Sequence, residues 1–175
     1  GMEGVCMKHI LYPDKYLDSV DQIDFGRLYQ EGFRGLIFDI DNTLVPHGAP
    51  ADEKAVRLFA RLRQLGFDSV LLSNNKEPRV KPFANRVGSR YIYKAGKPGV
   101  KSYQKAMEWM QTGCSNTLFI GDQIFTDIAG AKRAGITSYL VKPMNPKEEI
   151  QIVFKRYLEK IVLFFYLRRK VKSTG

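Results

Sequence analysis

Cysteine is scarce in this chain of 175 residues. The two cysteines, Cys6 and Cys114, lie far apart and form neither a CxxC pair nor a metal-ligand spacing. Their scarcity argues against a disulfide-stapled secreted scaffold and against a cysteine-ligated metal site. A chain of this length buries a sufficient core without such staples, so we expect one main domain in a reducing, cytoplasmic compartment.

Long hydrophobic runs are also missing. No apolar stretch approaches the roughly 18 residues that a membrane-spanning helix needs, and the amino terminus has no stretch of the kind found in signal peptides. We therefore expect a cytoplasmic protein, whose contact with a membrane, if it makes one, is peripheral and on the inner face of the plasma membrane.

Acidic residues are few relative to basic ones. The chain has 28 Lys and Arg against 18 Asp and Glu, which gives a net charge of +10. An excess of this size favours an anionic partner, either a membrane surface or a nucleic acid. From residue 142 onward there are nine basic residues and three acidic ones, so +6 of the +10 lies in this last segment.

Apolar strand candidates alternate with helical patterns through the middle of the chain. The strands are predicted at 35–39, 69–73, 91–93, 118–121 and 138–141, and the helices at 51–66, 100–110 and 126–135. Such alternation predicts right-handed βαβ units. We therefore expect an α/β fold with a mostly parallel, five-stranded sheet.

Short polar residues follow several of these strands directly. The first strand runs into "DIDNT", the second into "SNN" and the fourth into "GD", and they supply Asp39, Asp41, Thr43, Ser73, Asn74, Asp122 and, five residues later, Asp127. Lys97 precedes the helix at 100–110. In open α/β sheets, ligands bind at the carboxyl ends of the strands, so these side chains are expected to form one site.

The residue types suit phosphoryl transfer. Asp39 offers an oxygen nucleophile, but it repels a phosphate dianion unless a cation screens both. Mg²⁺ prefers carboxylate ligands, which Asp39 and Asp122 offer at the ends of two predicted strands. Lys97 and the Ser73 hydroxyl would hold other phosphate oxygens. Asp41 can protonate the leaving oxygen and later activate water.

Each of these signals is weak alone. A DxD sequence after a strand is commonly a capped turn, Ser73 and Asn74 alone make a loop, Lys97 alone is a solvated charge, and Asp122 could cap a helix. Their order along the chain resembles the haloacid dehalogenase-like (HAD) phosphohydrolases, whose pattern is DxDx[TV], then Ser or Thr, then Lys, then GD with a further acidic residue. The resemblance spans residues 35–141.

The resemblance implies more about the site. It implies a Rossmannoid three-layer sandwich in which the strands that carry Asp39 and Asp122 are neighbours, so that these two residues can share one ion. It also implies an aspartyl-phosphate intermediate and a third metal ligand from the backbone carbonyl of Asp41. Asp127 would support the metal either through water or from outside the direct ligands. The resemblance also implies that Thr43 and Asn74 contact the substrate. The carboxylate at Asp41 favours a phosphatase over a relative that keeps its aspartate phosphorylated.

The spacing of the motifs leaves no room for a cap domain. Only about 30 residues separate Thr43 from Ser73, and about 20 separate the "SNN" segment from Lys97. Caps close over small substrates and exclude water, so an uncapped site is open. We therefore expect a large substrate, such as a protein, a nucleic-acid end or a lipid headgroup.

The segment 146–175 is predicted to be a basic amphipathic helix with a short tail. Its apolar residues gather near one helical face: Ile150, Val153, Phe154, Tyr157, Leu158, Ile161 and Phe165. A helix of this composition can lie in a membrane interface and contact anionic phospholipid. A helix packed on the core and a dimer contact remain open alternatives, and the sequence does not indicate an oligomeric state.

The chain as a whole resembles the YqeG-like branch of uncapped HAD phosphatases, related to mitochondrial phosphatidylglycerophosphatases. The resemblance rests on "GDQIFTDIAGAKRAGI" and on residues 11–46, which lead into the first motif. We divide the chain into a lead segment at 1–34 and a phosphatase core at 35–145, followed by the segment 146–175. The resemblance implies phosphatidylglycerophosphate as substrate. Two other functions remain open: a phosphatase of soluble phosphoproteins, nucleotides or sugar phosphates, and a non-enzymatic RNA- or ribosome-associated module. No RNA-binding signature accompanies the charge, which makes nucleic acid an unlikely partner.

Overall fold

A computed structural model describes residues 10–173 of the chain. It divides into two compact units, Gly1–Met144 and Asn145–Gly175. Cys6, noted above, lies outside the described residues. The first unit contains the sheet and all the candidate site residues, and the second consists mainly of one long helix.

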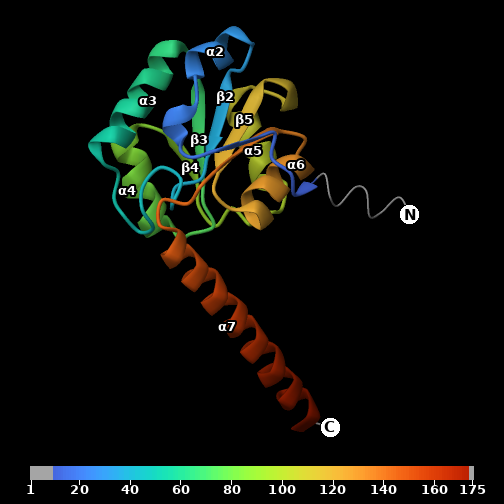
Figure 1. The fold of residues 1–175 in the computed structure, drawn as a ribbon. Coiled ribbons are helices and arrows are strands. Elements are labelled where there is room, and N and C mark those ends of the chain that lie inside the picture. The colour runs from blue at the N-terminus through green and yellow to red at the C-terminus, as the bar shows by residue number, and fades with distance from the viewer. Residues whose placement is uncertain (1–9, 174–175) are drawn as a thin grey trace. The chain divides into compact units, whose positions relative to one another are not determined.

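A six-stranded sheet forms the centre of the first unit (Figure 1). Across the sheet, the strands follow the order β1 (Lys15–Leu17), β6 (Thr137–Val141), β5 (Thr117–Gly121), β2 (Gly35–Phe38), β3 (Asp68–Leu72) and β4 (Arg90–Ile92). Every neighbouring pair is parallel. The five predicted strands are present. The additional strand, β1, comes from the lead segment and is too short to give an apolar pattern of its own.

Helices connect the strands. They are α2 (Phe25–Gln30), α3 (Glu53–Leu65), α4 (Glu77–Val87), α5 (Lys101–Met110) and α6 (Ala129–Arg133), with short 3₁₀ helices at Val20–Gln22 and Cys114–Asn116. The helix predicted at 51–66 is α3, which ends at Gly66 with a positive φ of 101°. Glycine suits this position because a side chain disfavours that backbone conformation.

Two helices differ from the prediction. The helix expected at 126–135 starts as a π-helical turn, Ile124–Ile128, and only then continues as α6. The sequence did not predict α4, which contains Pro78 in its first turn and Pro82 further along. Proline is tolerated at the start of a helix but usually breaks its interior, and here the four buried residues of α4 hold it to the core nevertheless.

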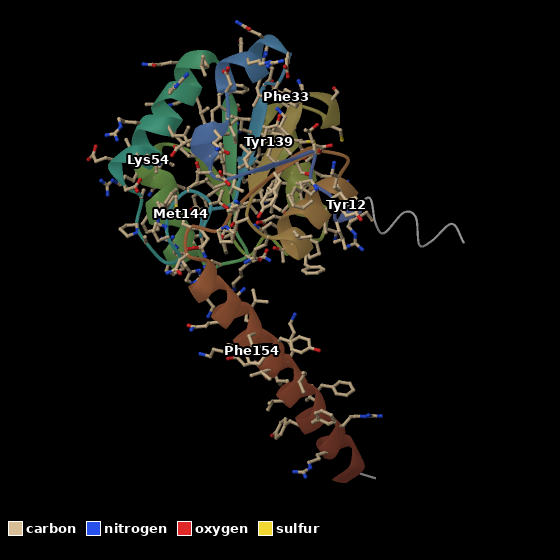
Figure 2. All side chains as sticks on the ribbon, viewed as in Figure 1. Tyr12, Phe33, Lys54, Tyr139, Met144 and Phe154 are labelled. Atoms are coloured by element: carbon tan, nitrogen blue, oxygen red, sulfur yellow. The ribbon has the colours of Figure 1, made fainter. Side chains whose placement is uncertain are left out.

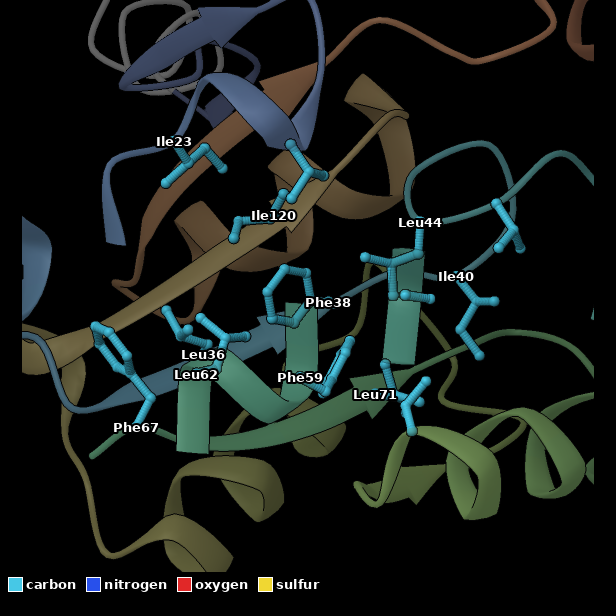
Figure 3. Packing of buried hydrophobic residues seen from close by; sticks show 14 of the residues in the cluster. Ile23, Leu36, Phe38, Ile40, Leu44, Phe59, Leu62, Phe67, Leu71 and Ile120 are labelled. Carbon is cyan, nitrogen blue, oxygen red and sulfur yellow. The ribbon is translucent and has the colours of Figure 1, made fainter. Parts of the chain in front are cut away.

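The sheet is apolar on both faces, which makes the unit a three-layer sandwich. In β2, Leu36 and Phe38 point to one face, where Figure 3 shows them with Phe59 and Leu62 of α3. Ile37, between them, belongs to the cluster on the opposite face, with residues of α5 and α6. Because successive strand residues point to opposite faces, an unbroken apolar run indicates a sheet covered on both sides.

No domain is inserted between the first motif and Lys97 in the described chain. The segment from Thr43 to Ser73 contains only α3 and β3 with their connections, and the segment from Asn75 to Lys97 contains α4 and β4. The ends of β2, β3 and β5 therefore have no cap from these two segments.

The second unit contains α7 (Pro146–Ser173). Eleven of its large apolar residues are exposed, with fractions from 37% to 66%; Phe154 is labelled in Figure 2. Residues 161–167 are seven consecutive apolar residues, which in a helix of 3.6 residues per turn point in all directions. In the described part of the chain, no helix is long and apolar enough to cross a membrane.

Candidate active site

Three carboxylates meet where β2 and β5 end. Asp39 follows β2 directly, and its N–H donates to the carbonyl of Ile120 in β5 at 3.0 Å. Asp122 follows β5 directly. With Asp127, they bring one carboxylate oxygen each to within 4.8 Å of one another. The parallel pairing of β2 and β5 thus gathers residues that lie 88 positions apart at most.

Lys97 lies between two of these carboxylates. Its ammonium group contacts Oδ1 of Asp39 at 2.8 Å and Oδ1 of Asp127 at 2.7 Å, and it donates to the carbonyl of Leu72 at 3.0 Å. The side chain of Lys97 is only 3% exposed. Its three ammonium hydrogens therefore have three acceptors, which fixes the charge at the ends of β2 and β3.

The electrostatics of this cluster follow from burial and from the number of charges. Burial alone would lower the pKa of Lys97, but the attraction of Asp127 and Asp39 outweighs burial and raises that pKa above its usual range. Burial and the neighbouring Asp39 raise the pKa of Asp127 to about 6, although Lys97 acts in the opposite direction. One ammonium group is shared by several carboxylates and does not neutralise them all.

Glycine and tyrosine position Asp127. A Cβ at Gly121 would lie 2.5 Å from Oδ2 of Asp127, so a side chain there would displace the carboxylate. The buried Tyr103 hydroxyl donates to the carbonyl oxygens of Asp127 and Thr126 at 3.1 and 3.2 Å. These contacts hold the π-helical turn that carries Asp127, and such turns are frequent at functional sites.

Asp41 has different partners from the other carboxylates. Its Oδ1 accepts from the guanidinium of Arg79 at 2.9 Å and from the N–H of Gly48 at 2.8 Å, and Asn75 donates to Oδ2 at 3.3 Å. Burial alone would raise the pKa of Asp41, but the Gly48 N–H and Arg79 outweigh burial and lower it. Asp41 is therefore an ionised carboxylate held at the edge of the site.

The remaining predicted residues make contacts inside the protein. The Thr43 hydroxyl donates to Oδ1 of Asp122 at 3.2 Å. The Ser73 hydroxyl accepts from the N–H of Asn75 at 3.1 Å and keeps its own hydrogen for another partner. The side-chain oxygen of Asn74 accepts a hydrogen bond from the backbone N–H of Lys97 at 2.8 Å, and its side-chain nitrogen donates one to the Lys97 carbonyl at 3.1 Å. Its amide is thus engaged in fixing the Lys97 backbone.

Sequence reasoning missed Arg79. This residue lies on α4, 38 positions from Asp41, and its guanidinium fork reaches the carboxylate through both Nε and Nη2. A lone arginine in "KEPRV" has no local feature that separates it from a solvated charge. Only the placement of α4 next to the first motif reveals the pair, and α4 itself was not predicted.

The donor set fits a hard divalent cation. Asp39, Asp122 and Asp127 offer carboxylate oxygens and neither nitrogen nor sulfur, which is the chemistry of Mg²⁺ or Ca²⁺ sites rather than of Zn²⁺ sites. With all three ionised and Lys97 protonated, the cluster carries a charge of −2. A divalent ion would balance that charge, and it would also remove the repulsion that raises the pKa of Asp127.

The comparisons with known proteins agree with this geometry. A model of the haloacid dehalogenase-like hydrolase family matches residues 48–135. The chain is 32% identical to a probable phosphatase, YqeG, of Bacillus subtilis over 158 residues, covering 90% of this chain and 92% of the relative. It is 26% identical to phosphatidylglycerophosphate phosphatase 1 of Arabidopsis thaliana, covering 95% of this chain but only 51% of the relative.

A solved structure shares the fold. The deoxy-D-mannose-octulosonate 8-phosphate phosphatase of Haemophilus influenzae, in a cobalt-bound form, superposes with a TM-score of 0.53 at 13% identity. The match covers 65% of this chain and 80% of that one. At so low an identity the likeness establishes the α/β architecture and leaves the substrate open.

Proposed function

The chain belongs to the haloacid dehalogenase-like hydrolase family and is a phosphatase, and we propose that it hydrolyses phosphomonoesters with Mg²⁺ through an aspartyl-phosphate at Asp39. One observation carries this proposal: the Asp39, Asp122 and Asp127 carboxylates lie within 4.8 Å of one another, with Lys97 bonded to two of them. The cluster combines a nucleophile, a site for a divalent cation and a fixed positive charge for a phosphate oxygen.

The reaction divides into two steps on these residues. A carboxylate oxygen of Asp39 attacks phosphorus, and the bond from phosphorus to the alcohol oxygen breaks while Asp41 gives that oxygen a proton. Asp41, now a carboxylate, takes a proton from a water that attacks the phosphorus, and the bond to Asp39 breaks to release phosphate. Mg²⁺ held by Asp39, Asp122 and Asp127 would screen the repulsion between Asp39 and the phosphate dianion.

The environment of Asp41 favours the second step. Arg79 and the Gly48 N–H stabilise its ionised form, which is the form that activates water. The first step needs the protonated form, so we propose that the approach of the substrate changes the contacts of Asp41. The Ser73 hydroxyl, which has a hydrogen to donate, is placed to bind a phosphate oxygen, as Lys97 is once the substrate arrives.

We propose a phospholipid such as phosphatidylglycerophosphate as the substrate. The relative in Arabidopsis thaliana bears that substrate in its name. Two exposed apolar side chains, Ile124 and Phe125 at 39% and 74%, lie in the turn between Asp122 and Asp127. An uncapped site with an apolar edge suits the headgroup of a lipid better than a small polar ester.

A phosphatase assay tests the function and the substrate together. Phosphatidylglycerophosphate in mixed micelles, a sugar phosphate, a nucleotide and a phosphopeptide would be compared with Mg²⁺ and with a chelator. We expect the lipid to give the highest kcat/KM and the chelator to abolish turnover of all four. A soluble compound with a higher kcat/KM than the lipid contradicts the lipid proposal, and full activity in chelator contradicts the metal proposal.

The helix α7 is proposed to contact anionic lipid. It combines exposed apolar residues with eight basic residues against three acidic ones, Glu148, Glu149 and Glu159. Basic residues near an anionic leaflet contribute roughly 1 kcal/mol each. We expect binding to vesicles that contain phosphatidylglycerol and none to vesicles of neutral lipid.

A quadruple variant tests this contact. Replacement of Arg168, Arg169, Lys170 and Lys172 by Gln should weaken binding to anionic vesicles by about 4 kcal/mol at most. Hydrolysis of a small chromogenic ester should survive, because the variant leaves every carboxylate of the site in place. Unchanged vesicle binding, or loss of both properties together, would show that the role of the helix is structural.

A further inference from the structure

A cavity in the first unit is lined in part by Thr43, which contacts Asp122 of the catalytic cluster. It has a volume of about 240 Å³, and its lining comes from α3, from the 3₁₀ helix Val20–Gln22 with Ser19, and from Thr43, Leu44 and Met144. We call it the α3 cavity. Pockets that hold drug-sized ligands start at about 300 Å³, so the α3 cavity suits a group of roughly the size of a phosphoglycerol.

The α3 cavity is connected to the active site through the first motif. Thr43 lines the cavity and also donates its hydroxyl hydrogen to Asp122. Met144, which follows β6, donates its N–H to the carbonyl of Asn42 at 3.2 Å. Lys54 and Met144, which both line the cavity, are labelled in Figure 2. A ligand in the cavity therefore lies next to the loop that supplies Asp39 and Asp41.

The charge of the cavity is positive. One stripe of α3 contributes Lys54, Arg57 and Arg61, at i, i+3 and i+7, so the three side chains share one helical face. Asp21 is the acidic residue of the lining, and it is ion-paired with Lys54. Arg57 and Arg61 form no ion pair or hydrogen bond with the described residues, and both are exposed. The two arginines, whose backbone positions lie about 6 Å apart along the helix axis, thus remain available to an anion.

The rest of the lining is not hydrophilic. Val20, Leu44 and Ala55 are buried, and the half-buried Leu58 of α3 also lines the cavity. The two arginines therefore adjoin an apolar floor in the cavity. A guanidinium group can donate two parallel hydrogen bonds to the oxygens of one phosphate, and partly apolar surroundings strengthen these hydrogen bonds.

We infer that the α3 cavity binds a second phosphate group of the substrate, carried on the alcohol that leaves when the phosphomonoester is cleaved at Asp39. Arg57 and Arg61 would hold this group, and the apolar floor would contact the carbon chain between the two phosphates. The inference rests on the proposed function, since it names the substrate class of the same site. It predicts selectivity for a phosphomonoester that carries a further phosphate or phosphodiester a few bonds away.

The kinetic test compares substrates that differ only in the second phosphate. Propane-1,3-diol bisphosphate and its monophosphate would be assayed with Mg²⁺, with the rate for the bisphosphate halved for its two equal ends. We expect kcat/KM to favour the bisphosphate by about tenfold or more, the scale of one or two charge-assisted hydrogen bonds. In the variant R57Q/R61Q this ratio should fall towards one. A ratio that is unchanged overturns the inference.

A matched control separates the cavity from the overall charge. The variant K81Q/R133Q also removes two exposed cations, from α4 and α6, that form no ion pair with the described residues, and it should keep the parent's ratio. If it lowers the ratio as much as R57Q/R61Q does, the effect is general electrostatics and the inference is wrong. Phosphatidylglycerophosphate in mixed micelles, assayed with both variants, shows whether a lipid phosphodiester uses the same arginines as the soluble bisphosphate.

A measurement of binding without turnover tests this inference separately from the proposed function. Glycerophosphoglycerol carries a phosphodiester and no phosphomonoester, so its affinity can be measured by calorimetry without turnover. We expect R57Q/R61Q to weaken it by about tenfold and K81Q/R133Q to leave it unchanged. Equal affinity for the parent and R57Q/R61Q overturns the inference. Absence of hydrolysis of every phosphomonoester would instead refute the proposed function, and the calorimetric result would still decide the cavity.

Discussion

Two carboxylates of the site, Asp127 and Asp41, each contact a basic side chain, yet their pKa values move in opposite directions. Asp127 contacts Lys97 at 2.7 Å and has a pKa raised to about 6, whereas Asp41 contacts Arg79 at 2.9 Å and has a lowered pKa. The surroundings explain the difference. Lys97 is shared with Asp39, a like charge to Asp127, whereas Arg79 serves Asp41 together with the Gly48 N–H.

The comparison teaches that an ion pair alone does not make a carboxylate stable in its charged form. The pKa of a carboxylate depends on the balance of all the charges and hydrogen-bond donors near it. The inner cluster of Asp39, Asp122 and Asp127, when fully ionised, carries more negative charge than Lys97 offsets, so a proton on Asp127 or a further cation would stabilise it. The outer pair of Asp41 and Arg79 is balanced and requires none. Each prediction below changes one side of this comparison.

The largest effect is expected from Asp39→Asn. The substitution removes the nucleophile and one metal ligand at nearly constant volume, so turnover should fall by about 10⁴-fold or more. It also removes the negative charge beside Asp127, so the fold should be retained or stabilised. Steady-state kinetics and circular dichroism measure the two effects. Turnover within tenfold of the parent would rule out Asp39 as the nucleophile.

The next largest effect is expected from Lys97→Met. This variant leaves Asp39 and Asp127 buried without their cation, and removal of one member of a buried ion pair costs about 3–5 kcal/mol of stability. Chemical denaturation in the absence of Mg²⁺ measures the loss. Lys101→Met is the matched control, because Lys101 is exposed on α5, and it should change stability by less than about 0.5 kcal/mol. Equal stability of the two variants would contradict the shared-cation account.

Mg²⁺ should stabilise the folded protein, and pH should govern by how much. At about 100 times its Kd, a ligand adds roughly 2.7 kcal/mol, which corresponds to an increase in Tm of roughly 5–10 °C for a domain of this size. Thermal scans with and without Mg²⁺ measure it. Asp122→Asn should reduce the increase, because Asp122 is one of the three carboxylates that gather there.

The sign of the pH dependence follows from Asp127. Its folded pKa, about 6, lies above the ordinary 3.8, so without metal its contribution to stability is full below about pH 3.8 and is lost as the pH rises through 6. Mg²⁺ needs the ionised carboxylate, so the increase in Tm should grow over the same range. An increase in Tm that is the same at pH 5 and pH 8 would show that Asp127 does not couple to the metal.

The sequence predicted the inner cluster better than the outer pair, for a physical reason. Asp39, Asp122 and Lys97 lie at the ends of strands or just before a helix, and the parallel order of strands brings such positions together whatever the details of packing. The contact of Arg79 with Asp41 depends on how α4 packs, which apolar periodicity does not specify when two prolines interrupt it. The amide of Asn74 was expected to face the substrate, but its bonds to Lys97 depend on a backbone path that no local pattern encodes.

The fold shows the same division. The apolar strands β2, β3, β5 and β6, of four or five residues each, and the three-layer architecture follow from alternation with helices and from burial on both faces, as in Leu36, Ile37 and Phe38. The edge strand β1 contains three residues, two of them exposed, and it is defined by its pairing with β6 rather than by its own composition. Elements with an uninterrupted apolar pattern were predictable, whereas β1, which is defined by its pairing, and α4, whose pattern two prolines interrupt, were not.

The smallest effect is expected from Arg79→Gln, which changes only the outer pair. Loss of the guanidinium should raise the pKa of Asp41 towards its ordinary value, because burial then acts against a weaker set of donors. A higher pKa keeps Asp41 protonated to higher pH, so the alkaline fall of kcat/KM for an alkyl phosphate should move upward by about one pH unit or less. p-Nitrophenyl phosphate is the control substrate, since its leaving group departs without a proton and its alkaline limb should not move. A shift of the alkaline fall for both substrates, or for neither, would show that Arg79 does not act through the protonation of Asp41.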